Sequence, residues 1–446
     1  MIARDLNLPT EELLVTDLND SFLRWFRTTM PYINAHRGKT FVVGFGGEAV
    51  LHPHFEDIIH DLTLLHSLGI QLVVVHGMRP QIEQRLEKTQ LPSKYHQGVR
   101  VTETAALPFV LEAAGVTRMT IEAQLSMGLI NSPMHNASVR VCSGNFVVAK
   151  PYGTRDGVDY CHTGEVRRIE QKSMQQHLAA GEMVLLSPIG YSPTGETFNL
   201  AWEEVAQAAA QALQADKLFL LTDGAIQNAQ GELIRELNLV TAKQQLMTSD
   251  SLKIPLQAAI AACENGVQRC HLVSLEIRGG LLHELFTREG CGTLLSIHAY
   301  EQIRQATIDD VGGILELIRP LEDEGVLVRR SRELLETEIP YFTVIERDGM
   351  MIGCAALYPF SQYAEMACVV VHPDYRDQQR GVALLNHVEK QAKQLAIQHL
   401  FVLTTRTGHW FLEQGFVAGN VEQLPVEKQA LYNYQRQSKV FIKKLV

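Results

Sequence analysis

Short apolar segments alternate with longer helical patterns from about residue 40 to residue 295, and this alternation constrains the fold more than any other feature. The segments "TFVVGF", "LVVVHG", "VLLSP", "LFLLTD" and "CHLVS" each end in turn residues, which is typical of buried strands. Between them lie helical patterns, of which "WEEVAQAAAQALQADK" (202–217) is the clearest. This order predicts an α/β fold with a mostly parallel sheet covered by helices on both faces.

The carboxyl ends of these strands are the expected place for a ligand. Gly46-Gly47, His76-Gly77 and Thr222-Asp223-Gly224 form turns there. Glycines let a backbone approach a phosphate closely. However, no lysine stands in the stretch "FVVGFGGEAV" (41–50) to neutralise one. The residues alone therefore leave the purpose of the glycine turn open.

The length of 446 residues exceeds what one hydrophobic core usually serves, so two or three domains are expected. Around residue 300 the pattern changes to "IRQATIDDVGGILELI", which predicts a strand, a capped turn and an amphipathic helix. We expect an N-terminal leader over 1–24, a first domain over 25–295 and a second domain over 296–446.

Charge and cysteine usage narrow the function classes. The net charge of −10 argues against a nucleic-acid partner, and no apolar run is long enough to predict a membrane span. The seven cysteines form no C-x-x-C pair, and the first 30 residues lack the apolar core of a signal peptide. We expect a cytoplasmic protein with small-molecule ligands, no metal and no permanently bound cofactor.

The stretch "EMACVVVHPDYRDQQRGVALLNHVEKQAKQLA" (365–396) is the most informative part of the second domain. It predicts a strand to Val371, a loop, and a helix from Gly381 onward. A loop that runs into a helix N-terminus can bind an anion such as pyrophosphate, and Arg376 and Arg380 could add charge-assisted hydrogen bonds. The alternative is an ordinary strand–turn–helix with two solvated arginines.

The order "VVVHPDYR…RGVALL" resembles the acetyl-CoA loop of the GNAT acetyltransferase superfamily. Arg376 and Gly381 fit its signature, whereas Gln379 stands where the first glycine is expected. "FVLTTRTGHWFLEQGF" (401–416) is similar to the later strand and aromatic helix of that fold, although its two aromatics could equally be core residues. The resemblance implies acetyl-CoA as co-substrate, bound by Cys368, Val369, Val370, Arg376, Gln379, Arg380, Gly381, Val382, Ala383, Trp410 and Phe411.

"FVVGFGGEAV", "LVVVHGMRPQI", "NLAWEEVAQAAAQALQADKLFLLTDGA" and "GCGT" resemble successive motifs of the amino-acid kinase family, a three-layer α/β sandwich. Gly44 stands at the position of the phosphoryl-binding lysine, Gly77-Met78-Arg79 replaces a run of three glycines, and Trp202 stands where an aspartate is expected. Lys217 matches a nucleotide-contacting lysine. Because phosphoryl transfer depends on positioned charge, the resemblance implies a kinase-like domain without kinase activity.

The two halves in this order, from about residue 25 onward, resemble the bacterial N-acetylglutamate synthase family. The resemblance implies acetyl transfer from acetyl-CoA to the amine of L-glutamate, feedback inhibition by L-arginine, and a homohexamer. Two alternatives remain. One is an N-acetylglutamate kinase-like protein with an accessory acetyltransferase domain, against which Gly44 and Met78-Arg79 count. The other is an arginine sensor in which the GNAT fold is also inactive.

Glutamate has two carboxylates, so its site needs at least two cationic or hydrogen-bonding groups. The resemblance places substrate binding on Arg329 or Arg330, Arg436 and Ser438. Only the free amine attacks a thioester, so a base is needed, and Glu365 at the head of the strand is the candidate.

A backbone amide near Cys368 or Val369 could stabilise the oxyanion of the tetrahedral intermediate. Thr404, Cys368 and Tyr432 are possible proton donors to the leaving thiolate, and the sequence does not choose among them. Cys368 could also be an acetyl carrier, although a buried strand cysteine is commonly a packing residue.

The stretch "CHLVSLEIRGGLLHELFTREGCGT" (270–293) is similar to arginine-sensitive members of the kinase family. The resemblance places the guanidinium of L-arginine on Glu284, with backbone at Gly290 nearby and Tyr32 covering the ligand. The alternative is that Glu284 caps a surface turn and Tyr32 is a packing residue.

Overall fold

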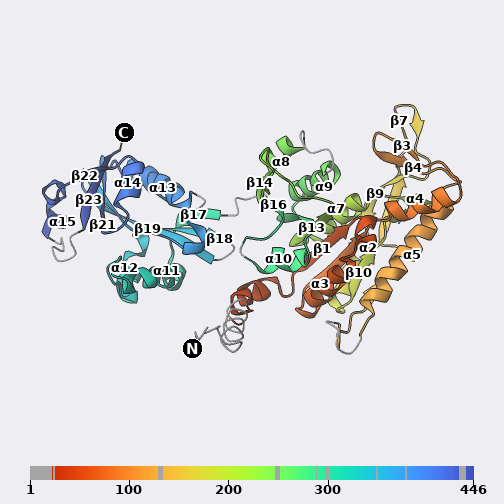
Figure 1. Cartoon of the computed structure of the whole chain (residues 1–446), viewed down its shortest axis with the longest axis horizontal. Coiled ribbons are helices and arrows are strands. Elements are labelled where there is room, and N and C mark those ends of the chain that lie inside the picture. Colours follow the sequence, from red (N-terminus) through yellow and green to blue (C-terminus); the bar gives the residue numbers. More distant parts are fainter. Residues whose placement is uncertain are drawn as a thin grey trace, which may run out of the picture. The chain divides into compact units, whose positions relative to one another are not determined.

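The computed structural model forms two compact units, Met1–His298 and Ala299–Val446, each with its own sheet (Figure 1). No helix in the described part of the chain is long and apolar enough to cross a membrane. The structure describes residues 23, 26–128, 134–246, 252–287, 289–296, 301–347, 350–376, 379–430 and 438–445.

An eight-stranded sheet organises the first unit, and it is parallel except where β15 pairs with β16. All five segments predicted as buried strands are strands of this sheet: β1, β2, β10, β13 and β15. Across the sheet the order is β14 (Glu236–Asn238), β16 (Thr293–Ser296), β15 (Arg269–Ser274), β13 (Lys217–Thr222), β1 (Thr40–Phe45), β2 (Gln71–His76), β10 (Met183–Leu186) and β5 (Val141–Cys142).

Helices cover both faces of this sheet, as the alternating pattern predicts. Phe41, Val43 and Phe45 of β1 point into one apolar layer, and Val42 points into the other. The first layer is covered by α3 (Phe55–Ser67), α5 (Leu107–Leu125) and α10 (Gly280–Phe286), and the second by α6 (Gln171–Ala179), α7 (Trp202–Leu213) and α9 (Lys253–Glu264). Figure 1 shows α3 and α10 on one side of the sheet and α7 and α9 on the other. The unit is a three-layer sandwich.

Helix α7 is shorter than predicted. It ends at Leu213 because Gln214 adopts a left-handed backbone, and Lys217 is already the first residue of β13. Lys217 pairs in register with Phe41, near the amino end of β1, whereas the glycine turn follows Phe45 at the carboxyl end. The match of Lys217 to a nucleotide-contacting lysine is therefore wrong, because Lys217 lies at the amino ends of the strands and the glycine turns lie at their carboxyl ends.

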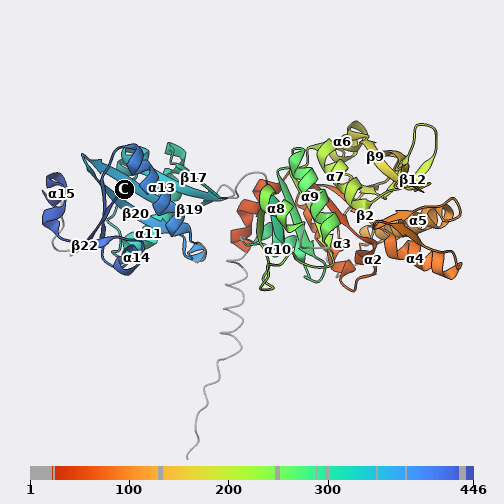
Figure 2. The same ribbon diagram turned by 90° about the horizontal axis from the view of Figure 1, so that it is seen from above.

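The remaining elements of the first unit surround this sandwich. A second sheet has the order β12 (Thr197–Asn199), β11 (Ile189–Tyr191), β6 (Val147–Pro151) and β9 (Gly164–Ile169). Two hairpins are β3 (Lys94–His96) with β4 (Val99–Val101), and β7 (Thr154–Arg155) with β8 (Val158–Asp159). The other helices are α2 (Gly47–Leu51), α4 (Arg79–Lys88) and α8 (Leu239–Gln245) (Figure 2).

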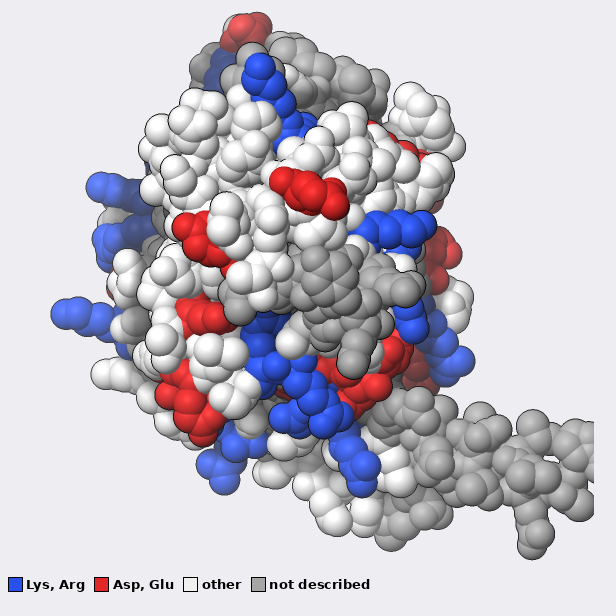
Figure 3. Space-filling view, turned by 90° about the vertical axis from the view of Figure 1, so that its left-hand side faces the viewer, with Lys and Arg blue, Asp and Glu red and all other residues white. Residues whose placement is uncertain are grey.

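The second unit has a seven-stranded sheet whose pairs are antiparallel except β20 with β21. Its order is β17 (Glu301–Gln305), β18 (Phe342–Arg347), β19 (Met350–Phe360), β20 (Tyr363–Val371), β21 (His399–Thr404), β23 (Lys439–Lys444) and β22 (Val417–Gly419). Its helices are α11 (Val311–Asp323), α12 (Arg332–Glu338), α13 (Arg380–Gln394), α14 (Gly408–Glu413) and α15 (Val426–Ala430). On the face seen in Figure 3, basic and acidic side chains lie interspersed among uncharged ones.

Candidate active site

Strands β20 and β21 separate in the middle of the second sheet. Their parallel register runs only from Tyr363 opposite His399 to Glu365 opposite Phe401, while β20 continues to Val371. Cys368 has a φ of 51°, and the register between β19 and β20 shifts there, so β20 carries a bulge just beyond the point of separation. An extended ligand can therefore bind along the backbone of β20 where β21 has diverged.

The loop after β20 leads into α13 through a strained residue. Gln379 has φ 57° and ψ 14°, the left-handed conformation that a glycine adopts most easily. Gln379 thus stands where the signature has a glycine, and its backbone adopts the left-handed conformation that a glycine would adopt there. The first-turn amides of a helix that begins at Arg380 have no intrahelical partner and point toward an anion. Ala383 donates its amide to the Gln379 carbonyl, so that amide is excluded from the anion site.

The two loop arginines have different environments. Arg380 is 5% exposed, and its Nε lies 2.8 Å from both carboxylate oxygens of Glu301 in β17, while its Nη1 donates to the Tyr375 carbonyl. The predicted contact of this guanidinium with pyrophosphate needs correction, because the side chain is buried in an ion pair that fixes the loop to the sheet. Arg376 is exposed, and its Nε donates to the carbonyl of Val371.

Helix α14 places its two aromatics differently. Phe411 is 3% exposed and belongs to the apolar core, so the structure favours its packing role over contact with acetyl-CoA. Trp410 is partly exposed and lies against the first turn of α13, where a Cβ on Gly381 would come within 3.2 Å of its ring. Gly381 is therefore needed for the packing of Trp410, a reason that the loop signature does not reveal.

Glu365 lies at the last paired position before the strands separate, and it is 6% exposed. Its Oε2 is 2.6 Å from Nζ of Lys428 in α15. Reasoning from sequence missed Lys428, because a single lysine in a short polar helix has no distinctive pattern. The pair matters because a buried carboxylate needs a compensating charge.

The adjacent arginines of "LVRRSRE" differ in burial. Arg329 is 78% exposed, whereas the side chain of Arg330 is 14% exposed, with its Nε 3.8 Å from Glu338. Burial opposes the charge of Arg330, but the neighbouring Cys368, Tyr358 and Glu338 raise its pKa above the ordinary value. Of the two, Arg330 is the one near the bulge of β20.

The remaining candidate residues are the possible proton donors, the possible acetyl carrier and two further glutamate-binding residues. Burial raises the pKa of the Cys368 thiol to about 11, which argues against a thiolate acetyl carrier. Thr404 accepts hydrogen bonds from the amides of Arg406 and Thr407, so its hydroxyl caps the turn before α14. Ser438 is 8% exposed just before β23. Arg436 and Tyr432 lie outside the described residues.

Comparison with known proteins identifies the chain. The amino acid kinase family model matches residues 39–274, and the acetyltransferase (GNAT) family model matches residues 312–416. An amino-acid acetyltransferase of Azotobacter vinelandii is 54% identical over 95% of this chain and 99% of its own length, and one from Pseudomonas putida is 53% identical over the same shares. The chain belongs to the amino-acid acetyltransferase family. It is an N-acetyltransferase with acetyl-CoA as co-substrate.

Solved structures agree with this assignment. A structure of N-acetylglutamate synthase from Neisseria gonorrhoeae complexed with coenzyme A and L-arginine is 36% identical, covers 95% of this chain and 99% of that one, and has a TM-score of 0.88. A structure of the same enzyme with coenzyme A and N-acetyl-glutamate has the same identity and coverage and a TM-score of 0.62.

The kinase-like unit of this acetyltransferase has an indole, that of Trp202, beside its glycine turns. A Cβ on Gly44 would lie 2.8 Å from Cζ3 of Trp202, and a Cβ on Gly77 would lie 2.8 Å from its Cδ1. A Cβ on Gly46 would lie 3.7 Å from Nε1 of the same ring. The ring thus fills the space beside the glycine turns and leaves no room for a lysine at position 44.

Glu284 is a buried, hydrogen-bonded carboxylate in the same unit. Its Oε1 is 2.7 Å from Nδ1 of His271, and its Oε2 accepts from the amides of Cys291 and Gly292 at 2.7 and 2.8 Å. Burial alone would raise its pKa, but these hydrogen bonds outweigh burial and lower the pKa of Glu284 to about 2. The interpretation of Glu284 as a cap of a surface turn does not fit its 5% exposed side chain.

Several polar groups surround Glu284 beneath α10. Lys217 is 7% exposed on the same face of the sheet, and Nε2 of His271 is buried without a hydrogen-bond partner among the described residues. Gly290 has a φ of 62°, and a Cβ there would meet Glu284 at 2.4 Å. Tyr32 lies in the helical residues 26–36, which contact α10 through His36 and the carbonyl of Leu285.

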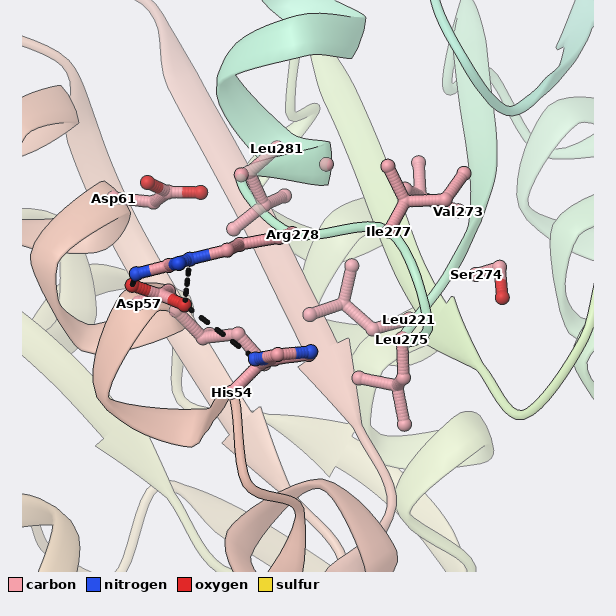
Figure 4. A pocket seen from close by; sticks show the side chains of 13 residues that line it. His54, Asp57, Asp61, Leu221, Val273, Ser274, Leu275, Ile277, Arg278 and Leu281 are labelled. Atoms are coloured by element: carbon pink, nitrogen blue, oxygen red, sulfur yellow. Dashed lines mark hydrogen bonds and ion pairs between the residues drawn. The ribbon is translucent and has the colours of Figure 1, made fainter.

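A small pocket lies next to this region, between α3 and the turn before α10 (Figure 4). Asp57 receives two hydrogen bonds from Arg278, at 2.8 and 3.3 Å, and lies 3.7 Å from His54. Asp61 is buried beside them, and burial together with the charge of Asp57 raises its pKa to about 7. The pocket thus holds a carboxyl group that titrates near neutral pH.

Proposed function

We propose that this enzyme transfers acetyl from acetyl-CoA to the amine of L-glutamate, giving N-acetyl-L-glutamate and CoA in the first step of L-arginine biosynthesis. The observation that carries the proposal is the buried Glu365 at the separation of β20 and β21, with the Arg330 guanidinium near the bulge of the same strand. The likeness to the Neisseria gonorrhoeae synthase supports glutamate as the acceptor.

Acetyl-CoA would bind in the opening between the two strands. Its pyrophosphate would accept hydrogen bonds from the first-turn amides of α13, with exposed Arg376 alongside. Its thioester would then lie along β20 near Cys368 and Val369. The bulge at Cys368 changes the direction of backbone groups there, and a backbone amide could stabilise the oxyanion of the tetrahedral intermediate.

Glutamate would be held through its carboxylates by Arg330, Arg436 and Ser438. Glu365 would accept a proton from the substrate ammonium, directly or through water, so that the free amine attacks the thioester carbonyl. Lys428 compensates the buried charge of Glu365 between turnovers. The leaving thiolate takes a proton from a donor near the site, for which Thr404 and Tyr432 remain candidates.

Thiol release from acetyl-CoA, measured against a panel of amino acids, tests the activity. We expect L-glutamate to give the highest kcat/KM, and a different preferred acceptor would overturn the proposal. Arg330→Met should raise the KM for glutamate by a factor that corresponds to roughly 2–4 kcal/mol, because a carboxylate loses its partner. Arg329→Met is the matched control and should change little, since that side chain is 78% exposed.

Replacement of Glu365, the proposed base, should lower turnover without affecting the binding of acetyl-CoA. We expect Glu365→Gln to lower kcat most strongly near neutral pH and to leave acetyl-CoA affinity, measured by calorimetry, almost unchanged. Full activity of Glu365→Gln would move the base elsewhere.

We further propose that L-arginine binds beneath α10 and inhibits the enzyme. The guanidinium would bind to Glu284, near the backbone of Gly290, with Tyr32 covering the ligand. The buried cluster of Glu284, Lys217 and His271 supports this site because it places charge inside an otherwise apolar layer. We also propose domain limits of 25–295 and 296–446 and a cytoplasmic location. The protein is further proposed to form a homohexamer, which analytical ultracentrifugation tests.

A further inference from the structure

Three side chains that can each donate a lone pair to a metal converge at one edge of the first unit, away from the residues assigned above. They are Cys142, His177 and Glu182, and their ligand atoms all lie within 4.8 Å of one another. Nδ1 of His177 is 2.6 Å from Oε2 of Glu182. We propose that these three residues form a binding site for one zinc ion.

Each of the three ligands comes from a different structural element, which the fold holds in place. Cys142 ends β5, the edge strand, and pairs in register with Val184 of β10. His177 lies in the last turn of α6, where its ring contacts the edge of the Phe146 ring. Glu182 immediately precedes β10, and its amide donates to the carbonyl of His177. The positions therefore do not depend on a long flexible loop.

The chemistry of the three donors selects the metal class. A thiolate with an imidazole and one carboxylate suits zinc, whereas magnesium and calcium prefer sites made of oxygen ligands. His177 and Glu182 have side chains that are 35% and 27% exposed, and Cys142 is half-buried. Solvent thus reaches the site, so an ion can enter and water can complete four-coordination.

A hydrogen bond between His177 and Glu182 is the simpler explanation for that pair alone. It does not account for the third donor, because the pair needs no thiol and Cys142 approaches from a separate strand. To bind one zinc ion, the His177–Glu182 contact must open from 2.6 Å to the wider spacing of ligands around a tetrahedral ion. That change needs only small side-chain rotations in a partly exposed site.

Cobalt titration of the full-length protein, after chelation and reduction of its cysteines, tests the site. We expect one Co²⁺ to bind with a thiolate-to-cobalt absorption band in the near ultraviolet and to be displaced by Zn²⁺. Cys142→Ser should abolish the band, and His177→Gln and Glu182→Gln should each weaken binding at least about tenfold. Cys161→Ser is the matched control, because Cys161 is an exposed cysteine of the same unit, and its titration should equal that of the unmodified protein.

Circular dichroism and acetyl transfer check that each variant is folded. A second measurement does not depend on variants: X-ray absorption of the zinc-loaded protein should show one sulfur at about 2.3 Å with nitrogen or oxygen ligands at about 2.0–2.2 Å. The proposal is overturned if the unmodified protein shows no thiolate band, if the band survives in Cys142→Ser, or if the zinc spectrum contains no sulfur.

Discussion

Substitution of Glu284 by glutamine separates regulation from catalysis and tests the arginine site most directly. The change keeps the size of the side chain but removes its charge. An amide at this position has no charge for the guanidinium of L-arginine, and its single oxygen cannot accept both from the amides of Cys291 and Gly292 and from His271 on the opposite side. We expect acetyl transfer to persist, since the residues assigned to catalysis are in the other unit, and we expect arginine inhibition to disappear.

The structure also gives the size of the accompanying stability loss. The pKa of Glu284 falls from 4.5 to about 2 on folding, and at 1.36 kcal/mol for each pKa unit this corresponds to about 3 kcal/mol. Because the folded pKa is depressed, the stabilisation is fully present above pH 4.5 and is lost as the pH falls toward 2. The variant should therefore be less stable by about 3 kcal/mol at pH 7, and the difference should shrink in acid.

Arginine inhibition curves and urea unfolding of the first unit, at pH 7 and pH 4, provide the assay. Glu289→Gln is the matched control, because Glu289 is in the same segment but its side chain is 48% exposed, and it should leave both measurements unchanged. If Glu284→Gln kept its full response to arginine, Glu284 would not bind the guanidinium. If its stability at pH 7 matched that of the unmodified protein, the assigned hydrogen bonds to the carboxylate would be refuted.

Substitutions at three other positions have defined outcomes. The pKa of Asp61 is raised to about 7, so folding favours its protonated form, and the free energy of unfolding should fall as the pH rises from about 4 to above 7. Asp61→Asn should remove this pH-dependent loss of stability, which amounts to as much as about 4 kcal/mol, and melting temperatures measured across this pH range check it. Gln379→Gly should retain or tighten acetyl-CoA binding in calorimetry, whereas Gln379→Val should weaken it, because a β-branched residue tolerates the left-handed backbone poorly. Lys428→Met should leave the buried Glu365 carboxylate without its partner and lower kcat/KM at pH 7 by about tenfold, and an unchanged kcat/KM would contradict the role of the pair.

The strands and layers were predictable because their signals are local. Each apolar segment of the first unit carries its own turn residues, and the alternation of Phe41, Val42 and Val43 between two apolar layers follows from strand geometry. The separation of the chain into two α/β units likewise follows from a change in local pattern around residue 300. Such features need no knowledge of distant contacts.

The side-chain partners in the active site were not predictable, because they join residues far apart in the sequence. Lys428 reaches Glu365 from a short helix, and Arg380 reaches Glu301 across 79 positions. From sequence, Arg380 resembles a phosphate-binding arginine, and only its burial shows that the side chain is already paired. The bulge at Cys368 is equally hidden, since β20 has an unbroken apolar sequence there.

The glycines in and around the turn at residues 46–47 are closely packed, and a Cβ on Gly47 would come within 2.8 Å of Cα of Met78. Gly44, Gly46 and Gly77 all face the ring of Trp202, and at Gly44 and Gly77 an added Cβ would come as close as 2.8 Å to that ring. Gly44 and Trp202 therefore depend on each other, because the indole occupies the space that a lysine at position 44 would need. In a Gly44→Lys variant, the lysine side chain would therefore collide with the indole of Trp202.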